Sequence, residues 1–141
     1  MKIEETEKEI ISEFEMFDDW LDRYNYLIEM GKSLHVIDAK NKSETNLIHG
    51  CQSRVWLHAE FVDGHIHFTA DSDAVITRGI ISLLIRVLSD RTPDEIIHAK
   101  LEFIDAIGLT QHLSPSRSNG LTSMIKQIKL YALAFKAKEQ V

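Results

Sequence analysis

The chain has 141 residues, of which 44% are hydrophobic and 27% charged, a composition typical of a globular protein and unlike that of a disordered or fibrous one. Its 22 acidic and 16 basic residues give a formal net charge of −6 at pH 7. This charge disfavours binding to nucleic acids or membrane surfaces, because both are polyanions. No apolar run is long enough to cross a bilayer, and the length suits a single domain over residues 1–141.

The N-terminal segment and the cysteine usage bear on the cellular compartment. The first 15 residues are rich in glutamate and lack the basic and apolar regions of a secretory signal. One cysteine in the whole chain precludes an intrachain disulfide. Both features predict a reducing, cytoplasmic location.

Two amphipathic helices are expected near the N-terminus. Residues 3 to 17 place apolar side chains at helical spacing between glutamates, and residues 20 to 31 repeat the pattern. Asp18 or Asp19 is suited to begin the second helix, and Gly31 is suited to end it in the left-handed conformation. The polar residues 38 to 46 then predict a surface loop that leads towards the cysteine.

From Val55 the hydrophobic period changes to two, which predicts a β-hairpin folded on the turn signal Asp63-Gly64. This register gives the sheet one apolar face, which packs, and one more polar face. The apolar face pairs Phe61 with Ile66, Ala59 with Phe68 and Leu57 with Ala70, while the polar face pairs Glu60 with His67 and Val62 with His65.

A core helix is expected after the hairpin. Residues 75 to 88 carry apolar side chains around most of the helical circumference, as in a central buried element. Ser72 or Asp73 is suited to cap this helix. The carboxylates of Asp71 and Asp73 would also be favoured by the dipole at the helix start.

The remaining residues are expected to form three further helices. Thr92-Pro93-Asp94-Glu95 is a capping-box pattern that opens a short helix. Residues 103 to 107 predict another short helix ending at Gly108, residues 112 to 120 predict turns, and residues 121 to 138 predict the last helix. The resulting fold class is α+β, with helices packed around a small antiparallel sheet.

The lone cysteine, Cys51, lies in the stretch IHGCQSRVW, between Gly50 and a run of polar residues. A cysteine used for packing more often sits inside an apolar run, so this placement predicts a thiol at a loop tip. The alternative is a buried and inert small hydrophobe. Arg54 and Arg117 would lower the pKa of the thiol if the fold brings them close.

Several kinds of chemistry are open to this thiol. A redox switch would need a resolving cysteine, and a Cys–His hydrolase would need one of the seven histidines as its base. A zinc site could use the hairpin residues His58, Glu60, His65 and His67, although simple alternation along a solvated strand explains the same pattern. A single mobile thiolate can accept a sulfur atom from a partner's persulfide without further help.

Four segments of the chain, in the same order, resemble the SufE family of sulfur acceptors. They are DWLDRYNYLIEMGKSL at 19–34, GCQSRVW at 50–56, DSDAVITRG at 71–79 and LTQHLSPSRSNGLTSMI at 109–125. The resemblance covers nearly the whole chain and implies an α+β fold. His35 and Val36 depart from the family pattern, which often has a proline there, and Arg78 stands where lysine is common.

The resemblance implies that Cys51 is the thiol that forms the persulfide, and it marks Asp73 and Arg117 as matching positions near that loop. On physical grounds, Asp73 would hold the loop or the arginine in place, and Arg117 would favour the thiolate or persulfide anion. Gly50, which precedes the cysteine in a polar loop, is the candidate hinge. Gln52, Ser53 and His112 also match the family motifs, with structural roles.

The resemblance also implies partners. A SufS-type cysteine desulfurase would supply the sulfur and be stimulated by this chain, and a SufBCD-type scaffold would receive it for iron–sulfur cluster assembly. Pyridoxal phosphate would belong to the desulfurase, so this chain is expected to bind neither cofactor nor metal and to be a sulfur carrier rather than an independent enzyme. The alternative within the same chemistry is a CsdE-like acceptor that serves another desulfurase. Cys51 would be shielded between partners and would swing out on docking.

Overall fold

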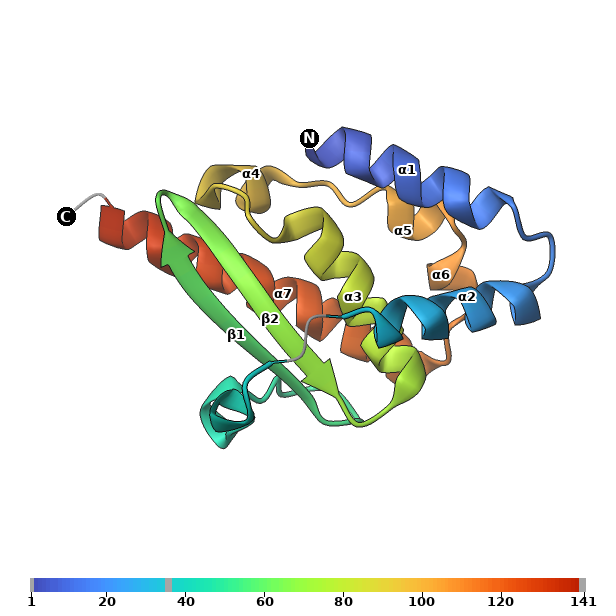
Figure 1. The fold of residues 1–141 in the computed structure, drawn as a ribbon, viewed down its shortest axis with the longest axis horizontal. Coiled ribbons are helices and arrows are strands. Elements are labelled where there is room, and N and C mark those ends of the chain that lie inside the picture. Colours follow the sequence, from blue (N-terminus) through green and yellow to red (C-terminus); the bar gives the residue numbers. More distant parts are fainter. Residues whose placement is uncertain (1, 35–36, 140–141) are drawn as a thin grey trace.

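The computed structural model describes residues 2–34 and 37–139, and it confirms the predicted α+β fold (Figure 1). His35 and Val36, the two departures from the family pattern, lie outside the described residues. The helices and strands are α1 (Ile3–Glu15), α2 (Trp20–Lys32), the 3-10 turns η1 (Ala39–Asn41) and η2 (Glu44–Asn46), β1 (Val55–Val62), β2 (His65–Ser72), α3 (Val75–Leu88), α4 (Pro93–His98), α5 (Phe103–Ala106), α6 (Leu109–His112) and α7 (Pro115–Glu139).

Helix α2 begins as predicted and ends differently. The Asp19 carboxylate caps it by accepting a hydrogen bond from the Leu21 N–H at 2.7 Å. Gly31 lies inside the helix and does not end it, so the predicted left-handed cap is wrong. A Cβ on Gly31 would lie 2.9 Å from the backbone nitrogen of Gly79 in α3, so this glycine is needed for the close crossing of two helices.

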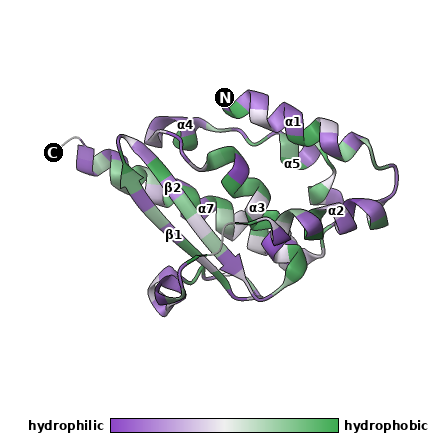
Figure 2. Cartoon of the chain, viewed as in Figure 1, coloured by the Kyte–Doolittle hydropathy of each residue, from purple (hydrophilic) through white to green (hydrophobic). Residues whose placement is uncertain are grey.

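The hairpin has the predicted register at all five pairs, and the turn falls at Asp63-Gly64. Figure 2 shows hydrophilic and hydrophobic residues alternating along β1 and β2. The apolar face is packed against the helices, because its residues Val55, Leu57, Ile66, Phe68 and Ala70 are each at most 1% exposed. The polar segment before the hairpin forms the two 3-10 turns on the surface, as the loop prediction requires.

Helix α3 is the core helix, as predicted, with nine buried residues and contacts to α1, α2, α7 and β2. Its predicted cap is wrong. The N-cap position is Ala74, and within the described parts of the chain no side chain caps the helix. Ser72 belongs to β2, and the Asp73 carboxylate accepts from a different segment, the N–H of Arg54, at 3.0 Å.

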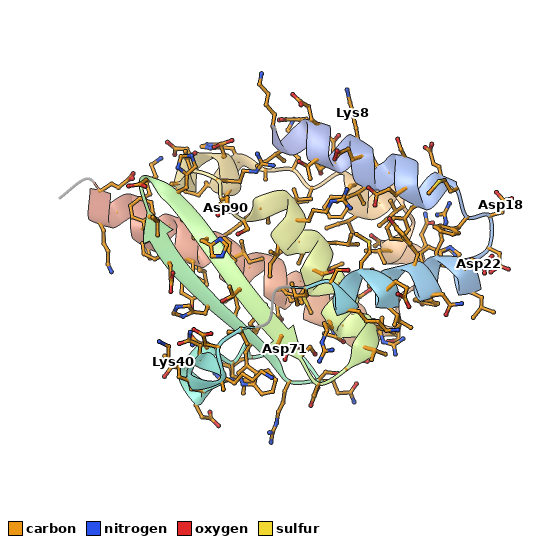
Figure 3. The ribbon with its side chains drawn as sticks, viewed as in Figure 1. Lys8, Asp18, Asp22, Lys40, Asp71 and Asp90 are labelled. Atoms are coloured by element: carbon orange, nitrogen blue, oxygen red, sulfur yellow. The ribbon has the colours of Figure 1, made fainter. Side chains whose placement is uncertain are left out.

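Asp71 also differs from the prediction that placed it at a helix start. It lies near the end of β2 (Figure 3), buried, with Lys42 Nζ at 2.6 Å and Arg78 Nε at 2.9 Å from its oxygens. Burial acts to raise the pKa of Asp71, but the hydrogen bond from Lys42 and the charge of Arg78 outweigh it and lower the pKa below its ordinary value. This ion cluster ties the 3-10 turns and α3 to the sheet.

The C-terminal helices confirm one prediction and correct another. The capping box is present at α4, where the Thr92 hydroxyl accepts from the Glu95 N–H and the Glu95 carboxylate accepts from the Thr92 N–H. Gly108 adopts a φ of 82° after α5, as expected. The predicted turn over residues 112 to 120 is wrong, because α7 already begins at Pro115 and is preceded by a short helix, α6, that the pattern did not indicate.

The C-terminal part of helix α7 packs against the hairpin, where Phe135 stacks on Phe61 with ring centroids 5.1 Å apart and the Tyr131 ring lies 6.4 Å from that of Phe68. Its other end, at Pro115, lies beside the beginning of α3, because residues from both helix starts line one cavity. Among the residues described, no helix combines the length and apolar character needed to span a membrane.

Candidate functional site

Residues 49–54 form a short loop whose base is fixed. The Ile48 N–H donates to the Val55 carbonyl at 2.8 Å, and Leu47 forms a β-bridge with Trp56. Inside the loop, Gly50 has a φ of 93°, which lies in the left-handed region that glycine adopts without steric cost. The fixed base and the glycine allow the loop to turn sharply and present Cys51 near its tip.

A reciprocal pair of hydrogen bonds joins this loop to the segment before α3. The Asp73 carboxylate accepts from the Arg54 N–H at 3.0 Å, and the Asp73 N–H donates to the Arg54 carbonyl at 3.2 Å. The Ser72 hydroxyl donates to the same carbonyl at 2.8 Å. Asp73 therefore contacts the backbone of the loop.

Cys51 packs against α7. Its thiol donates a weak hydrogen bond to the Gly120 carbonyl, with Sγ 3.7 Å from the oxygen, and the side chain is half-buried. A Cβ on Gly120 would lie 3.6 Å from Sγ. The loop approaches α7 more closely one residue earlier, where a Cβ on Gly50 would lie 2.5 Å from Ser123 Oγ. The thiol is thus on a loop, as predicted, but faces a helix.

A cavity of about 340 Å³ opens beside the thiol. The loop and the first turns of two helices build it, so segments far apart in the sequence meet there. Its lining comprises Cys51, Gln52 and Ser53 from the loop, Thr77 and Ile80 from α3, and Ser114, Ser116, Arg117, Gly120 and Met124 from the N-terminal end of α7 and the residue before it. Arg117, Gln52 and Ser53 are therefore brought together with Cys51.

The electrostatics of the thiol differ from the prediction. Burial raises the pKa of Cys51, so the neutral thiol is favoured in this conformation. The predicted lowering by Arg54 and Arg117 is wrong here. Arg54 is exposed at the end of the loop and is absent from the cavity lining, and Arg117 lines the cavity but is exposed, so its charge is solvated.

His112 lies at a different place from the other predicted site residues. Its ring stacks on Trp20 with centroids 4.0 Å apart, and its carbonyl accepts from the Tyr24 hydroxyl at 2.6 Å. It does not line the Cys51 cavity. These contacts join α6 to α2.

The other histidines each have separate surroundings. His67 Nδ1 lies 2.8 Å from an Asp90 oxygen, and His58 lies 3.3 Å from Glu60. Within the described ranges, no group of three or more histidine, cysteine or acidic side chains is arranged to hold a metal ion. None of the six described histidines lines the Cys51 cavity, so in this conformation none of them is placed to act as the base of a hydrolase.

Sequence reasoning missed the residues that close the cavity opposite the thiol, namely Thr77, Ile80, Gly120 and Met124. All four lie within the motifs DSDAVITRGI and SRSNGLTSM. The helical spacing of Ile80 and Met124 is that of ordinary core packing, Gly120 falls in the segment predicted as turns, and no pattern singles out Thr77. The fold and the site together define an α+β protein that presents one cysteine on a loop docked against a helix.

Comparison with known proteins gives the family. A model of the SufE family, described as an Fe–S metabolism associated domain, matches residues 8–132. An uncharacterised SufE-like protein of Rhizobium meliloti (strain 1021) is 40% identical over 126 residues, which are 86% of this chain and 90% of that protein. An uncharacterised SufE-like protein of Synechocystis sp. is 36% identical over 126 residues, covering 89% of this chain and 79% of the relative. The chain therefore belongs to the SufE family, which is associated with iron–sulfur metabolism.

Two further matches add to this. The chloroplastic/mitochondrial SufE-like protein 1 of Arabidopsis thaliana is 37% identical over 132 residues, which cover 93% of this chain but only 36% of the plant protein. The solution structure of a hypothetical protein from Thermus thermophilus superposes with a TM-score of 0.75 over 92% of this chain and 94% of that one. At 19% identity, that likeness shows the fold alone.

Proposed function

We propose that this protein accepts sulfane sulfur from a SufS-type cysteine desulfurase onto Cys51, stimulates that enzyme by removing its persulfide, and delivers the sulfur to a SufBCD-type scaffold. The observation that carries the proposal is the placement of the only cysteine. It lies near the tip of a loop with a fixed base, beside a cavity, and is held against α7 by one weak hydrogen bond. Membership of a family associated with iron–sulfur metabolism supports the same chemistry.

The transfer needs no outside oxidant or reductant. The Cys51 thiolate attacks the outer sulfur of the partner's cysteine persulfide, and a new S–S bond forms on Cys51. The S–S bond in the partner breaks, and the partner's cysteine leaves with the electron pair as a thiolate. Cys51 then carries the persulfide, and the number of S–S bonds is unchanged.

The burial of the thiol fits a carrier that works in two states. In the docked state the raised pKa keeps Cys51 protonated and weakly nucleophilic, which limits reaction with other thiols and electrophiles. In the undocked state Cys51 gains water and regains an ordinary pKa. The contacts at Gly120, Ser123 and Asp73 hold the docked state, and the partner's groove would replace them.

The test is a desulfurase reaction with free cysteine as substrate. Alanine production is measured with and without this protein, and the mass of Cys51-containing peptides is followed for the gain of one sulfur atom. We expect stimulation by the wild type and none by Cys51→Ser, because a hydroxyl cannot form a persulfide. Desulfurase with a small thiol alone gives the baseline. Equal stimulation by Cys51→Ser would exclude the acceptor role.

A CsdE-like role uses the same site and differs only in the partner. Supplying SufS-type and CsdA-type desulfurases separately distinguishes the two, since the cognate enzyme should be stimulated at the lower concentration of this protein. The cytoplasmic location and the delivery to a scaffold stay predictions.

A further inference from the structure

Thr77 differs from the other buried hydroxyl residues of the protein. It is the third residue of α3, is 7% exposed, and lines the Cys51 cavity. The buried hydroxyls of Thr6, Ser72 and Ser82 each donate a hydrogen bond to a backbone carbonyl. Within residues 2–34 and 37–139, the Thr77 hydroxyl forms no hydrogen bond to the protein, and its oxygen is not fully enclosed, so it keeps access to solvent.

This hydroxyl is free to bond a group that enters the cavity. Buried polar groups in folded proteins are almost always paired, with protein atoms or with ordered water. Thr77 lines a cavity large enough to admit water or a ligand atom, so a ligand there can take up its hydrogen bond. Valine has nearly the same shape as threonine and would line the cavity without offering a hydrogen bond.

The other walls of the cavity indicate the charge and softness of this ligand. Ser114, Ser116 and Arg117 stand at the N-terminus of α7, a helix of 25 residues, where the helix dipole and the unpaired N–H groups favour an anion. Ile80 and Met124 are apolar and suit a polarisable atom. Donors on one side and apolar side chains on the other fit a sulfur anion attached to Cys51.

We propose that Thr77 is a positioning residue for the sulfur that Cys51 carries, its hydroxyl donating a hydrogen bond to the outer sulfur of the Cys51 persulfide anion. The persulfide is one atom longer than the thiol, so its outer sulfur extends from Cys51 into the cavity. The hydrogen bond holds it there and keeps it away from small thiols in solution. This inference rests on the proposed function, because it concerns the product of the sulfur transfer.

The charged groups around the site are few. Arg117 is the one charged side chain among the described residues that line the cavity. Helix α3 contributes Thr77 and Ile80 to this lining, and both are uncharged. Arg54 and Asp73 are exposed and joined through hydrogen bonds to the Arg54 backbone at one end of the loop, and His49 is exposed at the other. The pH dependence of the persulfide should therefore report chiefly on Arg117, on the start of α7 and on Thr77.

The test uses the whole protein and needs no partner. Inorganic polysulfide loads Cys51 with sulfur, dithiothreitol is added, and mass spectrometry follows the loss of the extra sulfur over a range of pH. In this loss the small thiolate attacks the outer sulfur and Cys51 leaves as the thiolate. The variants are Thr77→Val, which removes the hydroxyl, Thr77→Ser, which keeps it, and Thr122→Val, a matched change at an exposed threonine of α7.

We expect Thr77→Val to lose sulfur about tenfold faster than the wild type and to shift the pH midpoint of the loss upward by about one pH unit, the size of one charged hydrogen bond. Thr77→Ser should stay near the wild type, and Thr122→Val should match it. The free energy of unfolding of Thr77→Val should stay within about 1 kcal/mol of the wild-type value, because the hydroxyl that is removed bonds no other group of the protein.

The proposal would be overturned if the persulfide of Thr77→Val lasted as long as that of the wild type. It would also be overturned if Thr77→Ser lost sulfur as fast as Thr77→Val. The result is separable from the proposed function. If wild-type Cys51 takes sulfur from polysulfide but never from a desulfurase, the acceptor role fails, while the comparison of the Thr77 variants still decides the role of the hydroxyl.

Discussion

Gly50 allows a direct test of whether the Cys51 loop opens. Its φ of 93° is left-handed, and alanine in that conformation costs about 1–2 kcal/mol. The new Cβ would also lie 2.5 Å from Ser123 Oγ, but that hydroxyl can rotate away, so the backbone cost decides. If the open loop is free of this constraint, Gly50→Ala favours the open state by a factor of about 5–30.

The assay is the rate at which a bulky maleimide modifies Cys51, because such a reagent cannot enter the cavity of the docked loop. We expect Gly50→Ala to react about 5–30 times faster than the wild type at the same pH, when opening is fast relative to modification. Gly50→Ala should lower the unfolding free energy by no more than the docking of the Cys51 loop against α7 contributes, because the backbone strain is relieved when the loop opens.

Gly64 provides the matched control. It has a similar φ of 81°, sits in the hairpin turn, and a Cβ there would meet nothing within 4 Å. Gly64→Ala should therefore lower the unfolding free energy by about 1–2 kcal/mol and leave the maleimide rate unchanged. Repeating Gly50→Ala in a Ser123→Ala background isolates the contribution of the contact. A Gly50→Ala protein that reacts no faster than the wild type, while Gly64→Ala is destabilised, would refute an opening loop.

Two further predictions concern the frame that holds the site. Gly79→Ala should lower the unfolding free energy by about 1–3 kcal/mol, because a Cβ there would lie 2.3 Å from the Leu27 carbonyl oxygen and the overpacking outweighs the gain of about 1 kcal/mol in helix propensity. Gly120→Ala, where the Cβ meets only Cys51, should be stabilising. Equal melting temperatures for the two variants would contradict the conclusion that Gly79 is needed for the close crossing of α2 and α3. The Glu13 pKa is lowered by its hydrogen bonds from Arg86, so the ionised carboxylate stabilises the fold above pH of about 5 and this contribution is lost as pH falls through the lowered pKa. Glu13→Gln should therefore cost about 1–2 kcal/mol in urea unfolding at pH 7 and progressively less in acid. Glu29→Gln, in an exposed pair with Lys32, should cost nothing measurable at either pH, and a loss for Glu13→Gln that persists unchanged in acid would argue against the ion pair.

The local elements were largely predictable because their signals are local. The hairpin register follows from strict alternation around Asp63-Gly64, since a one-residue slip would expose the whole apolar face. The capping box at Thr92 and the Asp19 cap are also formed by residues at most three apart. The start of α7 was missed because the serines, Asn119 and Gly120 are typical of turns, whereas the proline at the first helical position favours a helix.

By itself the sequence determined that one thiol stands next to a glycine in a polar loop before a hairpin, and its motifs indicated the family that the comparisons then showed. Only the tertiary structure decided what surrounds that thiol. Gly31 and Gly79 let α2 and α3 cross closely, α7 begins early enough to place Gly120 under Cys51, and Thr77 is left facing the cavity. These contacts join segments that are tens of residues apart in the sequence. They depend on how the helices pack against one another, and the spacing of residues along the chain does not predict that packing.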